Sequence, residues 1–137
     1  MYQDIATKIA LSFLGRPYIW SGDDPIAGFD CSGFIIEIMK SVGRLPLKGD
    51  WKAKHLYKKW EENKTSYPYE GCLVFWGKTP EGIYHVEYCI NEDLSIGARS
   101  GSKKTKTLED AIKQNAYIMI RPIRSRRPFA FVDPFMK

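Results

Sequence analysis

The most constraining feature of this sequence is a short segment at residues 29–34, FDCSGF, in which a cysteine stands among polar and small residues. Apolar residues then recur with helical spacing as far as Val42, which predicts a helix from about Cys31 to Gly43. Asp30 precedes this helix and has a side chain suited to capping it. A thiol in the first turn lies at the positive end of the helix dipole, which favours the thiolate. Cys31 is therefore a candidate nucleophile.

The composition indicates one compact domain, and we expect residues 1–137 to form it. The chain is 44% hydrophobic and 14% aromatic, which is typical of a folded protein. No apolar run approaches the roughly 18 residues of a membrane-spanning helix, so we expect no membrane span. The N-terminal residues lack the basic start and apolar stretch of a secretory signal. We therefore expect synthesis in the cytoplasm and delivery by other means if the protein acts at the cell surface.

The chain is basic, with a formal net charge of +5. Most of the excess lies late in the sequence, at Lys103, Lys104, Lys106, Arg121, Arg124, Arg126 and Arg127. Such residues form either a solvated face or a surface for an anionic partner, such as a cell-wall polymer. No nucleic-acid recognition motif accompanies them, so we expect no nucleic-acid partner.

The chain has three cysteines, Cys31, Cys72 and Cys89, and an odd count argues against a disulfide framework. We interpret Cys72 and Cys89 as core residues. Neither a Cys-x-x-Cys pair nor a pair of histidines at ligand spacing is present, so the sequence predicts no metal site and no cofactor.

The first half of the chain reads as helices joined by loops. Gly15 and Pro17 end the first apolar-periodic segment, and Asp50 is placed to cap the third. We expect helices over residues 2–14, 31–43 and 50–62, an extended segment over 17–20, and loops over 21–28 and 63–70.

The second half reads as strands. Its apolar, β-rich segments cover residues 72–76, 83–90, 94–98 and 116–123. The second and third of these are joined by a polar turn and predict a hairpin. Thr107 and Asp110 resemble a capping box for a short helix to about Asn115. Helices followed by antiparallel strands predict an α+β fold in which the N-terminal helices pack on an antiparallel sheet.

Two histidines are available as a base for the thiol. His55 lies in the lysine-rich third helix, between Lys54 and Lys58, which indicates an exposed position. His85 opens a predicted strand. A base on a rigid strand and a thiol on a helix can meet within hydrogen-bonding distance, as a Cys–His pair requires. Taken alone, these two residues prove little, because a buried cysteine is more often a small apolar core residue than a nucleophile.

Four segments in this order resemble the motifs of the NlpC-type cysteine peptidases, the bacterial and phage cell-wall endopeptidases. They are LGRPYIWSG at 14–22, FDCSGF at 29–34, GCLVFW at 71–76 and HV at 85–86. The similarity extends from the first helix to about Ala98 and implies a single papain-like catalytic domain. The C-terminal residues, with RP at 121–122 and DPF at 133–135, are similar to phage and prophage members.

The resemblance implies hydrolysis of the γ-D-glutamyl to diamino-acid bond of peptidoglycan stem peptides. Cys31 matches the nucleophile and His85 the general base. Tyr18 matches a tyrosine that holds the substrate or the oxyanion, and Asp30 and Ser32 match residues that line the pocket for the substrate's N-terminus. No cofactor is implied, and a phage tail or lysis assembly is a candidate partner.

Two positions depart from the family pattern. The family orients its histidine with His, Asn or Gln on the next strand, where this chain has Gly97. A water, a backbone carbonyl or Glu87, which two-residue alternation places on the same strand face as His85, could take that role. Cys72 stands where the family usually has Asp after Gly71.

Three functions stay open at this point. The leading hypothesis is a cell-wall cysteine endopeptidase. The second is a catalytically silent module that binds the cell wall or serves as a phage structural part, which Gly97 would favour. The third is acyl or amide transfer on other substrates by the same fold, because a fold does not determine a function.

Overall fold

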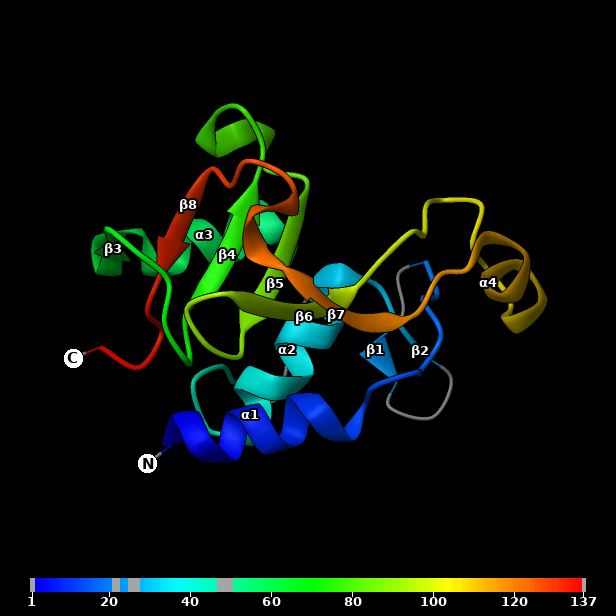
Figure 1. The fold of residues 1–137 in the computed structure, drawn as a ribbon, viewed down its shortest axis with the longest axis horizontal. Coiled ribbons are helices and arrows are strands. Elements are labelled where there is room, and N and C mark those ends of the chain that lie inside the picture. Colours follow the sequence, from blue (N-terminus) through cyan, green and yellow to red (C-terminus); the bar gives the residue numbers. More distant parts are fainter. Residues whose placement is uncertain (1, 21–22, 25–27, 47–50, 137) are drawn as a thin grey trace.

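We analysed a computed structural model of the chain, which describes residues 2–20, 23–24, 28–46 and 51–136. Its centre is a six-stranded sheet in which every neighbouring pair is antiparallel (Figure 1). The strands lie in the order β3 (Lys64–Thr65), β8 (Ala130–Val132), β4 (Leu73–Trp76), β5 (His85–Cys89), β6 (Leu94–Ala98) and β7 (Ile118–Pro122). The expected α+β architecture is confirmed.

Helix α2 (Cys31–Ser41) is the central helix and packs against β5 and β6 (Figure 1). Asp30 caps it as expected, because its Oδ1 accepts a hydrogen bond of 2.7 Å from the backbone N–H of Gly33. Its apolar residues are buried on more than one face, among them Phe34, Ile35, Ile38 and Met39. The sheet on one side and α1 on the other account for this burial, and they hold the first turn of α2 in a fixed place.

Helix α1 (Tyr2–Ser12) lies along the outside of α2 (Figure 1). It ends two residues earlier than the periodicity predicts, and Gly15, with φ of +86°, turns the chain away. Phe13 then packs edge-to-face on Phe29 and Phe34, with ring centroids 5.2 and 6.5 Å apart. These contacts tie the segment before Cys31 to the core.

The third helix is shorter than expected. Helix α3 runs over Ala53–Trp60 and continues as a 3₁₀ turn at Glu61–Asn63. Lys52 stands at its N-cap, where its backbone N–H donates to Nδ1 of His55 at 3.1 Å. The predicted cap, Asp50, lies outside the described residues.

Two strands of the six-stranded sheet were not expected. The segment 63–70, read as a loop, contains β3, and the C-terminal segment contains β8. β8 inserts between β3 and β4 and pairs with both. β3 has two residues and a polar sequence, so it lacks the apolar alternation from which a strand is recognised.

The other predicted elements are present. β5 and β6 form the expected hairpin, and β7 borders β6 at the far edge of the sheet. Helix α4 (Leu108–Gln114) has the predicted capping box of Thr107 and Asp110 and projects beyond the sheet (Figure 1). The predicted loop 21–28 lies partly outside the described residues, and its described part pairs β1 (Asp23–Asp24) with β2 (Gly28–Phe29).

Cys72 and Cys89 are fully buried free thiols, as the core interpretation expected. Within the described residues, no helix has both the length and the apolar character needed to cross a membrane.

Candidate active site

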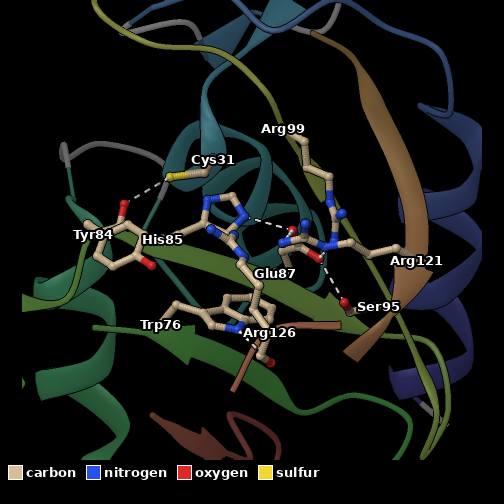
Figure 2. A network of polar contacts seen from close by, with 9 residues as sticks. All are labelled: Cys31, Trp76, Tyr84, His85, Glu87, Ser95, Arg99, Arg121 and Arg126. Atoms are coloured by element: carbon tan, nitrogen blue, oxygen red, sulfur yellow. Dashed lines mark hydrogen bonds and ion pairs between the residues drawn. The ribbon is translucent and has the colours of Figure 1, made fainter. Parts of the chain in front are cut away.

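Cys31 is the first residue of α2, and its side chain is partly accessible at the edge of β5. Its Sγ lies 4.0 Å from the carbonyl oxygen of Tyr84, the residue before β5 (Figure 2). The backbone N–H groups of Val86 and Ser32 also act on the sulfur and lower the pKa of the thiol. The helix therefore presents the thiol directly to the first residues of the strand that carries His85.

Burial outweighs these favourable contacts. Desolvation first, and the charge of Asp30 second, raise the pKa of the Cys31 thiol from 9.0 to about 12. A helix dipole contributes roughly 0.3–1 kcal/mol, which is less than the about 1.4 kcal/mol that shifts a pKa by one. The favourable contacts at the helix N-terminus are therefore too weak to hold the thiolate by themselves. A base must take the proton from the sulfur.

His85 is placed to be that base. It is the first residue of β5, pairs with Trp76 on β4, and its ring lies 5.4 Å from the indole. Cys31 and His85 line one cavity. Figure 2 shows the imidazole between Cys31 and Glu87. The structure thus brings together the nucleophile and base expected from the sequence.

Glu87 contacts the imidazole on the side away from the thiol. Its Oε2 lies 2.7 Å from Nε2 of His85, and the side chain is fully buried. An ionised carboxylate only accepts hydrogen bonds, so Nε2 must carry the proton in this contact. Nδ1 of the neutral ring is then left as the acceptor for the thiol proton.

Three further side chains hold the buried carboxylate of Glu87 (Figure 2). Oε1 accepts hydrogen bonds from Oγ of Ser95, at 2.7 Å, and from Nη2 of Arg99. Nη2 of Arg121 lies 3.5 Å from Oε2. A buried carboxylate is costly unless it is paired, and here two guanidinium groups compensate its charge.

Sequence reasoning proposed Glu87 as one of several substitutes at the Gly97 position. The described structure gives it the contact with the histidine that the family assigns to a residue on the next strand. Alternation along β5 was the signal for this placement. The contacts of Arg99 and Arg121 with Glu87 were missed. Arg121 was grouped with the basic residues of a solvated or anion-binding face, and Arg99, which is 5% exposed, was not singled out.

Tyr18 is buried beside Cys31, and the two residues line two adjoining cavities. Burial, followed by the nearby Cys31 and Asp30, raises the pKa of the Tyr18 phenol well above its usual range. The hydroxyl therefore stays protonated and can donate a hydrogen bond to a developing oxyanion.

Asp30 and Ser32 line the larger cavity, of about 510 Å³, together with Cys31. Besides capping α2, Asp30 accepts a 3.4 Å hydrogen bond from the hydroxyl of Ser32. The other four expected site residues, Tyr18, Asp30, Ser32 and His85, thus line the two cavities beside Cys31. His55 lies on α3 and borders neither of these two cavities.

The profile of the NlpC/P60 family matches residues 15–122. Protein P54 of Enterococcus faecium is 36% identical over 97 residues, which cover 71% of this chain and 18% of that protein. The bifunctional muramidase/DL-endopeptidase CwlT of Bacillus subtilis is 36% identical over 88 residues, 62% of this chain and 26% of that protein. The murein DD-endopeptidase MepH of Escherichia coli is 41% identical over 44 residues, 29% of this chain and 16% of that protein.

The fold of this chain is also similar to solved structures. The NlpC/p60 domain of the peptidoglycan hydrolase SagA has a TM-score of 0.70 at 25% identity and covers 96% of this chain and 97% of that chain. An NlpC/P60 family protein from Bacillus cereus has a TM-score of 0.75 at 21% identity, over 98% of this chain and 40% of that chain. The chain spans about a fifth to a quarter of the length of the P54 and CwlT relatives. The profile match and the shared architecture confirm the resemblance seen in the sequence: this chain belongs to the NlpC/P60 family and has its papain-like fold.

Proposed function

We propose that the protein is a cysteine endopeptidase that hydrolyses the γ-D-glutamyl to diamino-acid bond of peptidoglycan stem peptides. The observation that carries the proposal is that Cys31 and His85 line one cavity while Glu87 bonds the outer nitrogen of the imidazole. One relative is named a DL-endopeptidase, which supports this choice of bond.

The residues support a two-step acyl transfer. Nδ1 of His85 takes the thiol proton as Sγ of Cys31 attacks the γ-carbonyl carbon of D-glutamate. The oxyanion is stabilised by N–H groups in the first turn of α2 and by the Tyr18 hydroxyl. The imidazolium then protonates the departing amine, which leaves a thioester on Cys31. Water, deprotonated by His85, hydrolyses the thioester and releases the γ-D-glutamyl product.

The acyl half of the substrate fits the cavity that contains Asp30 and Ser32. A carboxylate and a hydroxyl there can accept and orient the amino group at the N-terminus of L-Ala-γ-D-Glu. The expected specificity is therefore for stem peptides with a free N-terminal amine.

The test is incubation with L-Ala-γ-D-Glu-diaminopimelate, followed by quantification of the released diamino acid. Cys31→Ala and His85→Ala should abolish release, whereas the matched controls Cys72→Ala and His55→Ala should retain it. Because one relative is named a DD-endopeptidase, a D-Ala-diaminopimelate cross-linked peptide forms the second arm. If only the second substrate is cleaved, the proposed γ-D-glutamyl bond is rejected and the D-Ala-diaminopimelate bond is the one that the protein hydrolyses.

A silent cell-wall-binding module is the alternative, and the raised pKa of the Cys31 thiol is the observation that favours it. It predicts that wild type and Cys31→Ala sediment equally with purified cell walls while neither releases product. Release by the wild type alone would exclude this alternative.

We further propose that delivery to the wall depends on a phage or lysis assembly, which the sequence similarity of the C-terminal residues to phage members supports. Cytoplasmic expression alone should leave cells intact, and a co-expressed membrane pore should make them lyse. Lysis without the pore would contradict this proposal.

A further inference from the structure

Cys31, Tyr18 and Tyr84 line both cavities, so the sulfur stands where the two meet. The second cavity, of about 380 Å³, has a different character from the one that contains Asp30. Three arginines, Arg99, Arg121 and Arg126, line it, and no aspartate or glutamate is among its described lining residues.

The positive charge of this cavity exceeds the negative charge behind it. Glu87 contributes one negative charge and is already bonded to His85, Ser95 and Arg99. Three guanidinium groups therefore face one carboxylate. Partial burial lowers the pKa of the Arg121 guanidinium; the charge of Glu87 opposes this effect and the charge of Arg126 adds to it.

Donors in this cluster also remain unused. Within the described residues, Nε of Arg99 and both Nε and Nη2 of Arg121 are buried and have no hydrogen-bond acceptor. A buried donor without an acceptor is costly, and a bound anion would remove that cost.

The indole of Trp76 keeps two of these cations in place. The guanidinium carbons of Arg121 and Arg126 lie 5.6 and 5.7 Å from its ring centroid, and its Nε1–H donates to the Arg126 carbonyl at 3.4 Å. Figure 2 shows Trp76 and Arg126 beside His85. Planar guanidinium groups held in this way suit the forked recognition of a carboxylate.

We propose that this arginine cavity binds a carboxylate of the residue on the leaving-group side of the scissile bond, and so selects diaminopimelate over lysine. The inference rests on the proposed function, because the acyl half then occupies the Asp30 cavity and the amine half is left to the arginine cavity. Diaminopimelate carries a carboxylate at the far end of its side chain, and lysine has none.

The carboxylate could come from two places, and three peptides separate them. All three peptides share the α-carboxylate of D-glutamate, so only the leaving-group residue differs. In L-Ala-γ-D-Glu-L-Lys this residue offers only the main-chain carboxylate. The diaminopimelate peptide with its main-chain carboxyl amidated offers only the far one, and the unmodified diaminopimelate peptide offers both. Their dissociation constants are measured by calorimetry on Cys31→Ala, in which binding is independent of cleavage.

Both diaminopimelate peptides should bind at least about tenfold more tightly than the lysine peptide, as for a charge-assisted hydrogen bond. Arg126→Gln should remove most of that preference. The matched control Arg127→Gln, an exposed arginine outside the lining residues, should retain it. Equal binding of all three peptides, or a preference that survives Arg126→Gln, would overturn the inference.

Wild-type turnover separates this inference from the proposed function. Binding preference without cleavage of any peptide would uphold the arginine cavity and reject the endopeptidase. Cleavage with equal affinity for the lysine and diaminopimelate peptides would uphold the endopeptidase and reject the selective role of the arginine cavity.

Discussion

Gly97 and Glu87 occupy complementary space on neighbouring strands. A Cβ placed on Gly97 would overlap Cγ of Glu87 and lie 2.8 Å from its Cδ. The missing side chain on β6 is therefore what allows a carboxylate from β5 to reach His85. Glu87 on β5 therefore makes the contact with His85 that the family pattern assigns to a side chain on β6, at the position of Gly97.

Gly97→Ala should reduce both stability and turnover. The added methyl group would force Glu87 from its place, and overpacking of this kind costs about 1–3 kcal/mol. Urea unfolding and kcat on the tripeptide provide the measurements. In a Glu87→Ala background the same substitution should cost clearly less stability, because the atoms it collides with are gone. Additive losses would contradict the steric relationship.

Glu87→Gln should lower kcat at least about tenfold with little change in KM, because the amide retains the shape but not the charge that supports the imidazolium. Glu92→Gln, in the exposed turn between β5 and β6, is the matched control and should be neutral. An equal loss in both variants, or a loss confined to KM, would reject a positioning role for Glu87.

His85→Ala should make Cys31 nearly inert to iodoacetamide at neutral pH. Burial and the charge of Asp30 raise the pKa of the Cys31 thiol. Without an imidazole to take its proton, the alkylation rate should therefore rise only at strongly alkaline pH. Rates are followed by mass spectrometry of the Cys31 peptide, with His55→Ala as the control. Unchanged alkylation at neutral pH would show that the imidazole does not activate the sulfur.

The free energy of unfolding should fall as the pH rises above about 9. Burial raises the pKa of Cys89, and burial together with the 2.6 Å hydrogen bond to Asp133 raises that of Tyr69. Above the pKa of the unfolded groups, the unfolded chain releases protons that the folded chain keeps, so alkali favours unfolding. Urea midpoints at about pH 8 and about pH 10.5 measure the loss.

Tyr69→Phe should make this alkaline loss smaller. Tyr67→Phe, which changes an exposed neighbour, should not. A midpoint that is independent of pH in the wild type would contradict the prediction.

The elements set by local sequence were predictable. The Asp30 cap, the apolar face of α2, the hairpin of β5 and β6 and the capping box at Thr107 each depend on residues close together in the chain. The Cys31–His85 pairing was reached through the order of the family motifs.

The features that could not be predicted from the sequence depend on contacts between residues that are far apart in the chain. Arg99 and Arg121 appear as ordinary basic residues until the sheet brings both to Glu87. β8 follows an arginine-rich, proline-containing segment, and its three residues become a strand only because β3 and β4 flank it. The burial that raises the pKa of the Cys31 thiol comes from packing around the helix end, which no local pattern records.

The position of β8 also has a consequence for biosynthesis. The strand next to the one that carries His85 gains its second neighbour only when residues 130–132 have left the ribosome, more than fifty residues after β4 was made. Until then the outer edge of β4 is an open template for pairing with other chains. A nascent chain is thus expected to depend on the emergence of β8 to close this edge of the sheet.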